Sequence, residues 1–151
     1  MNCKLFIDSY LEKIDKRFFF NGELNSAFEI FSIAAILDKP FDEVYTDIST
    51  LVKSENGNHD GRHDGGVDGI YFDENTATLA VFQTKYSKNI GDNEVSKFIT
   101  DYQNLFERKN SNHLPLNKNV EAKLERIWDI TKQGITYTPK LFFVFNGKKE
   151  G

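Results

Sequence analysis

The sequence has a single cysteine, Cys3, and no apolar run near the roughly 18 residues that indicate a membrane-spanning helix. One thiol excludes an internal disulfide, and the first residues carry no signal-peptide pattern. Both observations favour a protein of the reducing cytoplasm. An excess of positive charge is also missing, because 19 lysines and arginines stand against 23 aspartates and glutamates. Binding to nucleic acid mainly through bulk electrostatics is therefore excluded, and a few local lysines would have to supply any phosphate contacts.

Prolines and repeats are scarce as well. Only 3 prolines occur, and no repeat, low-complexity tract or long linker divides the 151 residues. A chain of this length is expected to form one domain, with 14 phenylalanines and 6 tyrosines as its large core groups. We therefore expect residues 1–151 to be a single domain, which could also be the amino-terminal part of a longer protein.

The first third of the chain carries helical spacing. Apolar residues recur every three or four positions between about 5 and 19, which predicts an amphipathic helix. Residues 23–37 are apolar almost all round, which predicts a central helix. Pro40 suits the first turn of a third helix, which would reach about Leu51. The polar, glycine-rich residues 54–66 then predict a surface loop.

The rest of the chain alternates between strand and helix patterns, with turn residues between the first two strands. In chain order we predict strands at 65–72 and 78–86, helices from about 95 and from about 117, and a buried strand at 140–145. This order predicts an α/β fold in which helices flank a central mixed β-sheet and the amino-terminal region is helical.

Three polar side chains fall at the open end of the predicted hairpin. A loop of two or four residues places Asp68 directly opposite Gln83, and directly opposed residues share a face of the sheet. Lys85 joins them because side chains alternate with a period of two. An acid, an amide and an ammonium among apolar neighbours are costly unless they bind something. Each also has an ordinary alternative: a strand-start aspartate, a hydrogen bond across the sheet and an edge lysine.

The residues around these three positions resemble a known family. Gly66-Val67-Asp68-Gly69 followed by Phe82-Gln83-Thr84-Lys85-Tyr86-Ser87 resembles the PD-(D/E)xK nuclease superfamily, and within it the Mrr-like restriction endonucleases that carry Gln-x-Lys. The pattern is also similar to the amino-terminal domain of abortive-infection phage-resistance proteins. The resemblance implies a restriction-endonuclease-like core and an endonuclease that hydrolyses phosphodiester bonds, with DNA as the expected substrate, in restriction or antiviral defence. A clear extra strand before Asp68, which the superfamily core would include, is missing from the pattern.

Glu29 is the only charged residue between Leu24 and Leu37, and charged groups are rarely buried without a partner. In Mrr-like nucleases a glutamate on the helix before the hairpin resembles this one, which implies that Glu29 reaches the metal. The alternative is a capping box, because Ser26-x-x-Glu29 has the required spacing. The capping interpretation requires the helix to begin at Ser26.

The resemblance implies a hard divalent cation, Mg²⁺ or Mn²⁺, with oxygen ligands from Asp68, Glu29, the Gln83 side chain and the Thr84 carbonyl. Such an ion polarises a phosphodiester and lowers the pKa of bound water, while Lys85 would orient the nucleophile and stabilise developing negative charge. The expected partner is nucleic acid, and a homodimer or further domains stay open. A hypothesis of another class is a catalytically inactive domain of the same fold that binds nucleic acid or a partner protein.

A second group of candidate ligands lies in the predicted loop, as His59-Asp60-Gly61-Arg62-His63-Asp64. Three interpretations stay open: a separate transition-metal site, a loop that closes over substrate and an ordinary solvated loop. The surrounding glycines favour a loop over a metal site held on helices.

Overall fold

The computed structural model describes residues 3–53, 59–60, 66–86, 89–107 and 116–149. In chain order its elements are α1 (Cys3–Phe18), α2 (Leu24–Leu37), α3 (Phe41–Glu43), the π-helical turn η1 (Val44–Ile48), β1 (Val52–Lys53), β2 (His59–Asp60), β3 (Gly69–Asp73), β4 (Thr78–Lys85), β5 (Asn89–Ile90), α4 (Asp92–Phe106), α5 (Lys118–Lys132), β6 (Thr138–Phe145) and β7 (Lys148–Lys149). The fold is α/β, with a helical amino-terminal region and a small mixed three-stranded sheet that helices flank.

The amino-terminal helices follow the apolar spacing of the sequence, and Pro40 directly precedes α3. The prediction that the third helix continues to Leu51 is wrong, because the chain passes from α3 into η1 and then extends at Ser49. Ser49 forms an isolated antiparallel bridge with Gly69, so pairing with the start of β3 ends the helix. None of the helices in the described part of the chain is long and apolar enough to cross a membrane.

β4 is the central strand of the sheet, with β3 antiparallel on one side and β6 parallel on the other. Gly69 lies opposite Phe82 and Asp73 lies opposite Thr78, which confirms the predicted hairpin register over these residues. The prediction that β6 is a buried strand is wrong. Its residues are half-buried or exposed because, within the described residues, β6 pairs only with β4 and forms an edge of the sheet.

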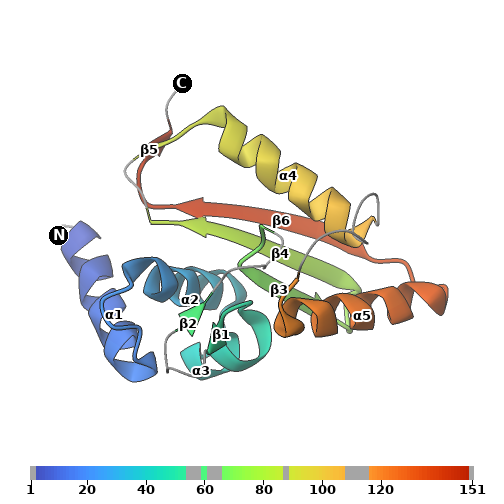
Figure 1. The fold of residues 1–151 in the computed structure, drawn as a ribbon, viewed down its shortest axis with the longest axis horizontal. Coiled ribbons are helices and arrows are strands. Elements are labelled where there is room, and N and C mark those ends of the chain that lie inside the picture. Colours follow the sequence, from blue (N-terminus) through green and yellow to red (C-terminus); the bar gives the residue numbers. More distant parts are fainter. Residues whose placement is uncertain (1–2, 54–58, 61–65, 87–88, 108–115, 150–151) are drawn as a thin grey trace.

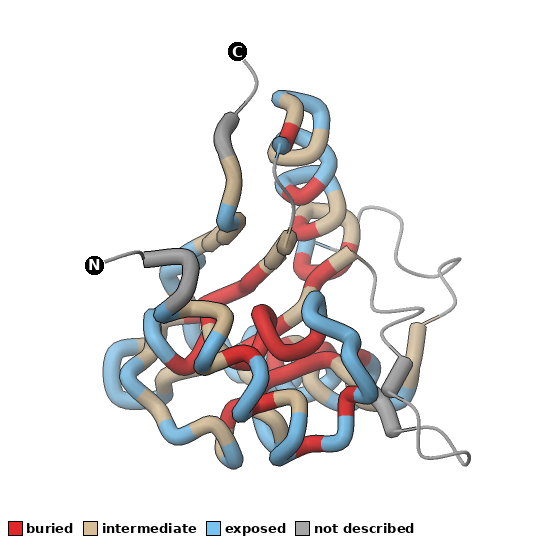
Figure 2. The backbone as a smooth tube through the Cα atoms, turned by 90° about the vertical axis from the view of Figure 1, so that its left-hand side faces the viewer, coloured by how far each residue is buried: buried red, intermediate tan, exposed pale blue. Residues whose placement is uncertain are grey.

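Alternate side chains of β4 enter two separate hydrophobic clusters. Ala80 and Phe82 pack with α1, α2 and η1, whereas Leu79 and Val81 pack with α4 and α5. Figure 1 shows the sheet running between α4 on one side and α1 and α2 on the other. In Figure 2 the buried positions gather in the middle of the molecule, where these layers meet. The even-numbered and odd-numbered residues of β4 therefore face different helices.

Two pairs of very short strands were not predicted, because two residues are too few to show a period of two. β1 pairs antiparallel with β2, and Lys53 lies opposite His59. The prediction of a loop throughout 54–66 is therefore wrong at His59 and Asp60, while 61–65 lie outside the described residues. β5 pairs in parallel with β7, directly before α4.

Gly69 lies where an added side chain would disturb the packing between α2 and β4. A Cβ atom there would lie 2.6 Å from Ile33 Cδ1 and 3.3 Å from Phe82 Cδ2, inside the closely packed cluster of α2 and β4. We expect Gly69→Ala to lower the free energy of unfolding by about 1 to 3 kcal/mol, measured by urea unfolding. Gly91→Ala is the matched control, because a Cβ atom there meets nothing within 4 Å. Equal losses in both variants would contradict the packing argument.

Candidate functional site

The predicted site residues lie where β3 begins and β4 ends. Asp68 stands directly before β3, and its backbone N–H donates to the Phe82 carbonyl over 2.7 Å. Its side-chain Oδ2 accepts the backbone N–H of Thr84 at 2.7 Å and the Thr84 hydroxyl at 3.2 Å. The Asp68 carboxylate is therefore fixed beside the segment that contains Gln83 and Lys85.

The alternation of β4 separates the side chains of this segment. Phe82 and Tyr86 pack into the cluster of α1 and α2, and Thr84 lies between them in the same alternation. Gln83 and Lys85 point the other way and line a cavity together with residues of α4. The hydroxyl that Asp68 accepts thus lies on the α2 side of the sheet, whereas the amide and the ammonium lie on the α4 side. The Asp68 carboxylate therefore does not join Gln83 and Lys85 in this cavity, as the predicted shared face required.

A cavity of about 510 Å³ opens at the carboxyl end of β4. It is lined by Gln83, Thr84 and Lys85, and by polar residues of α4. The Gln83 Oε1 atom is buried and has no hydrogen-bond partner among the described residues. An unpaired buried acceptor is costly, so this oxygen is suited to a donor or a cation brought by a ligand. Asp68 and Glu29 are not among the described residues that line the cavity.

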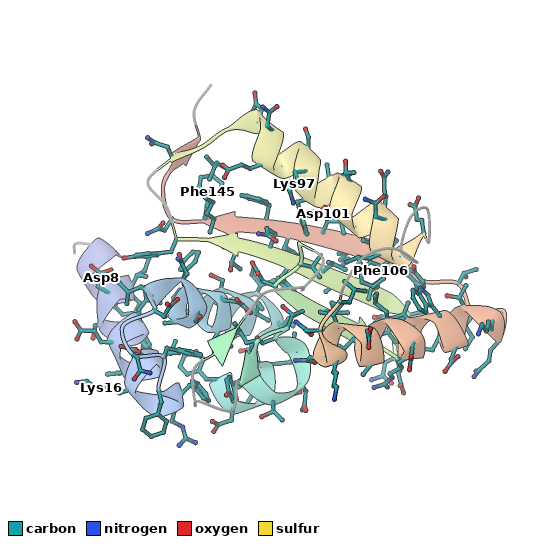
Figure 3. The ribbon with its side chains drawn as sticks, in the orientation of Figure 1. Asp8, Lys16, Lys97, Asp101, Phe106 and Phe145 are labelled. Carbon is teal, nitrogen blue, oxygen red and sulfur yellow. The ribbon has the colours of Figure 1, made fainter. Side chains whose placement is uncertain are left out.

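Two ion pairs bring the charges of this cavity into balance. Lys85 Nζ pairs with Glu94 Oε1, and Glu94 Oε2 accepts the backbone N–H of Gly91 at 3.0 Å. Lys97 Nζ pairs with Asp101 Oδ2 at 2.8 Å, one turn further along α4. Figure 3 labels Lys97 and Asp101 on the side of α4 toward β6. The cavity therefore presents two lysines and two carboxylates from these pairs, and no excess of positive charge.

Glu29 is buried inside α2, with 6% of its surface exposed. Its Oε1 atom accepts the Ser49 hydroxyl at 2.9 Å. The capping interpretation of Glu29 is wrong, because α2 begins at Leu24, its cap position is Glu23, and no side chain caps it. Ser26 is the third residue of the helix, and its backbone N–H donates to the Glu23 carbonyl at 3.1 Å. Glu29 is thus a buried acid that faces the chain segment after η1.

That segment, Ser49–Leu51, connects the two predicted acids. Thr50 donates its backbone N–H to the Asp68 carbonyl at 3.0 Å and its hydroxyl to the Val67 carbonyl at 2.8 Å. The Ser49 hydroxyl in turn donates to Glu29. Glu29 and Asp68 therefore both lie next to the buried residues Ser49 and Thr50. Thr50 bonds the backbone carbonyl of Asp68 and so fixes the position of this residue, while the Asp68 carboxylate accepts the backbone N–H of Thr84.

Sequence reasoning missed Ser49, Thr50 and Asn119, which together hold this segment. Asn119, in the first turn of α5, donates through Nδ2 to the Ser49 carbonyl at 2.9 Å and the Leu51 carbonyl at 3.2 Å. Ser49 and Thr50 are 0% and 1% exposed, and the only local signal was a polar pair near the end of the helix that was predicted to reach Leu51. The bonds of Asn119 to this segment join residues about 70 positions apart along the chain and leave no pattern that spacing could reveal.

The donor types present fit a hard divalent cation, because carboxylate, amide and carbonyl oxygens are the ligands that Mg²⁺ prefers. The buried Gln83 oxygen and the Asp68 carboxylate, which Thr84 holds, are two donors of these types at the same end of the sheet. No group of three or more His, Cys, Asp or Glu side chains within the described residues is arranged to hold a metal. Of the predicted loop cluster, His59 and Asp60 lie in β2, and the other residues fall outside the described ranges.

A second cavity, of about 570 Å³, lies at the other end of the sheet and is lined in part by Asp47, Phe72, Lys123 and Arg126. Burial lowers the pKa of the Lys123 ammonium below its usual range, and the nearby Asp47 carboxylate partly opposes this. The ammonium donates to the Asn119 side-chain oxygen. Through Asn119 this cavity therefore connects to the same Ser49–Leu51 segment that holds the two acids.

Comparison of the chain with protein-family models, with curated proteins and with solved structures finds no match. The resemblance described above consequently depends on the residues around Asp68 and Gln83 alone.

The lowered pKa of Lys123 predicts a pH dependence of stability. The folded chain releases this proton at lower pH than the unfolded chain, whose lysine keeps its ordinary pKa of 10.5. Folding stability therefore rises with pH between the folded and the unfolded pKa. We expect the stability of the wild type, relative to Lys123→Met, to increase between neutral pH and about pH 10 in denaturant unfolding.

Lys118→Met is the control for this experiment, because Lys118 is exposed on the same helix. Its difference from the wild type should stay constant over the same pH range. A constant difference for Lys123→Met as well would show that burial does not perturb this amine.

Proposed function

We propose that the chain is a metal-dependent nuclease of the PD-(D/E)xK type, with a restriction-endonuclease-like core, that hydrolyses phosphodiester bonds in nucleic acid. DNA is the proposed substrate, and restriction or antiviral defence is the proposed context. The observation that carries the proposal is the buried Gln83 oxygen, which has no hydrogen-bond partner among the described residues and lines one cavity with Lys85; the neighbouring Thr84 holds the Asp68 carboxylate. An amide oxygen left without a donor at such a place is explained by a bound cation.

Asp68, Gln83 and the Thr84 carbonyl would hold a Mg²⁺ or Mn²⁺ ion from the end of β4, and Glu29 would complete the set from α2. When bound, the ion would supply charge neutralisation at the scissile phosphate and a water of lowered pKa. For Glu29 to bind the ion, its carboxylate would have to give up the hydrogen bond from the Ser49 hydroxyl. A neutral glutamine in place of a glutamate makes the charge of Asp68 and Glu29 more important for affinity.

Asp68 is held in a single orientation by the backbone N–H and the hydroxyl of Thr84, so little ordering remains to be done when a ligand arrives. The Lys85 ammonium would bind a phosphate oxygen and stabilise the negative charge that develops on it during attack. An ammonium has three N–H donors, so Lys85 would bind the phosphate oxygen with one of them while another stays on the Glu94 carboxylate.

A second candidate is a non-catalytic domain of the same fold that binds nucleic acid or a protein partner. The observation that favours it is that three of the proposed site residues already have partners within the chain. Thr84 donates to Asp68, Ser49 donates to Glu29, and Lys85 pairs with Glu94. Such an arrangement is stable without any ligand, as a site that has lost its chemistry would be.

Cleavage assays separate the two candidates. Purified protein is incubated with plasmid, single-stranded DNA and RNA, with Mg²⁺, with Mn²⁺ and with chelator. We expect metal-dependent cleavage that falls by about 10²-fold or more in Asp68→Ala and in Lys85→Ala, because each loses a group that acts on the reacting phosphate. Lys132→Ala, an exposed lysine in the last turn of α5, serves as the control. Binding without cleavage, unchanged by Asp68→Ala, would support the second candidate.

Glu29→Gln tests the proposed ligand on α2. Glutamine keeps an oxygen that accepts the Ser49 hydroxyl but loses the charge, so we expect at least about a tenfold loss of cleavage with little change in melting temperature. Ser49→Ala provides the comparison, because it leaves the carboxylate but removes its donor, at a cost of about 1 to 3 kcal/mol in unfolding free energy. A glutamine variant that loses stability and cleaves normally would identify Glu29 as a structural acid.

A further inference from the structure

Glu94 connects the first turn of α4 to the end of β4. One carboxylate oxygen, Oε2, accepts the backbone N–H of Gly91, the residue before the helix, at 3.0 Å, which is the glutamate half of a capping box. The other oxygen, Oε1, pairs with Lys85 Nζ. A single side chain thus satisfies a backbone donor on its own element and a charged group on the central strand.

The capping bond keeps the Glu94 carboxylate in place. A glutamate free to rotate would hold a lysine only loosely, because both side chains lose rotamer freedom when they pair. Here one oxygen is fixed by the helix backbone, and the positive end of the helix dipole favours a carboxylate in the first turn. The helix is in turn anchored by Phe98, Tyr102 and Leu105, which are buried in the cluster on the α4 side of the sheet. The position of the carboxylate is therefore set by the core.

Lys85 gains a defined direction from this contact. Its side chain is 40% exposed, so packing alone does not determine where the ammonium lies. Lys97, on the same cavity, illustrates the contrast, because it is 72% exposed and pairs within its own helix with Asp101. The Lys85–Glu94 pair instead joins β4 to α4, and both residues line the cavity that Gln83 also lines.

We propose that Glu94 is a positioning residue, which holds the Lys85 ammonium in place for the phosphate through a carboxylate that the α4 capping bond fixes. This inference rests on the proposed nuclease function, and it adds a residue to which neither the sequence pattern nor the resemblance assigns a role. Glu94 itself does not touch substrate. It acts by reducing the number of positions that the lysine side chain samples before substrate binds.

Three variants test the inference. Glu94→Gln keeps an oxygen for the Gly91 N–H and removes the charge that holds Lys85, whereas Glu94→Ala removes both. Asp92→Asn is the matched control, because it removes one carboxylate from the same first turn. For each variant the melting temperature, kcat and KM of cleavage, and the rate of Lys85 acetylation by an amine-directed reagent are measured. Acetylation is followed by peptide mass spectrometry without metal or nucleic acid.

In Glu94→Gln we expect kcat to fall by about 10- to 100-fold at nearly constant KM and melting temperature, because the lysine is displaced while the helix cap remains. The Lys85 acetylation rate should rise several-fold relative to Lys97, since an ammonium held against a carboxylate reacts slowly. Asp92→Asn should change neither kcat nor the Lys85 acetylation rate. Glu94→Ala should show the same kinetic loss together with a lower melting temperature, because the helix cap is lost.

An unchanged Lys85 acetylation rate in Glu94→Gln would overturn the inference, as would an equal loss of kcat in Asp92→Asn. A fall in kcat that only accompanies a fall in melting temperature would assign Glu94 a purely structural role and overturn it too. Failure of the nuclease proposal can be told apart from failure of this inference. A wild type that cleaves no substrate overturns the nuclease proposal, whereas the acetylation rate of Lys85 relative to Lys97 still tests whether Glu94 holds Lys85.

Discussion

The hydrogen bonds of the segment Ser49–Leu51, in which Ser49 and Thr50 are buried, determine how the rest of the structure is arranged. Backbone and hydroxyl groups at this depth are costly unless each finds a partner, and here the partners come from three different elements. Ser49 donates to Glu29 on α2, Thr50 donates to the residues directly before β3, and Asn119 on α5 donates to the carbonyls of the segment. The hydrogen bonds leave little freedom in how α2, β3 and α5 meet.

These hydrogen bonds explain why the candidate site lies at the end of the sheet rather than on one of its faces. Asp68 is held by its backbone at the point where β3 starts, and β4 continues past it to Lys85. The carboxylate then bonds the backbone N–H and the hydroxyl of Thr84 on β4. The amide of Gln83 and the ammonium of Lys85 face α4, so groups from both sides of the sheet meet at its rim.

Local patterns in the sequence predicted much of this arrangement. The turn residues after Asp73 predicted the hairpin register, which places Gly69 opposite Phe82. The burial of Glu29 followed from its apolar helix, because a charge at that position has no solvent-facing side to use. These predictions rest on contacts between residues that are close in sequence or directly paired across one turn.

Contacts between distant segments could not be predicted in this way. The bonds of Asn119 to Ser49 and Leu51 and the pairing of Lys85 with Glu94 depend on how helices pack, which residue spacing does not encode. The π-helical turn η1 arises because Ser49 pairs with Gly69, and no property of residues 44–48 by themselves requires it. Long-range packing thus decided which polar groups share a neighbourhood.

The edge position of β6 carries a consequence for association between molecules. Thr138 donates its N–H to the carbonyl of Ala77, the residue directly before β4, so the alternation of a β-strand turns the backbone of Pro139 outward. Proline has no N–H to offer there, and an exposed lysine follows it at 140. A foreign strand could form an uninterrupted ladder only from Leu141 onward, which shortens the template available for aggregation.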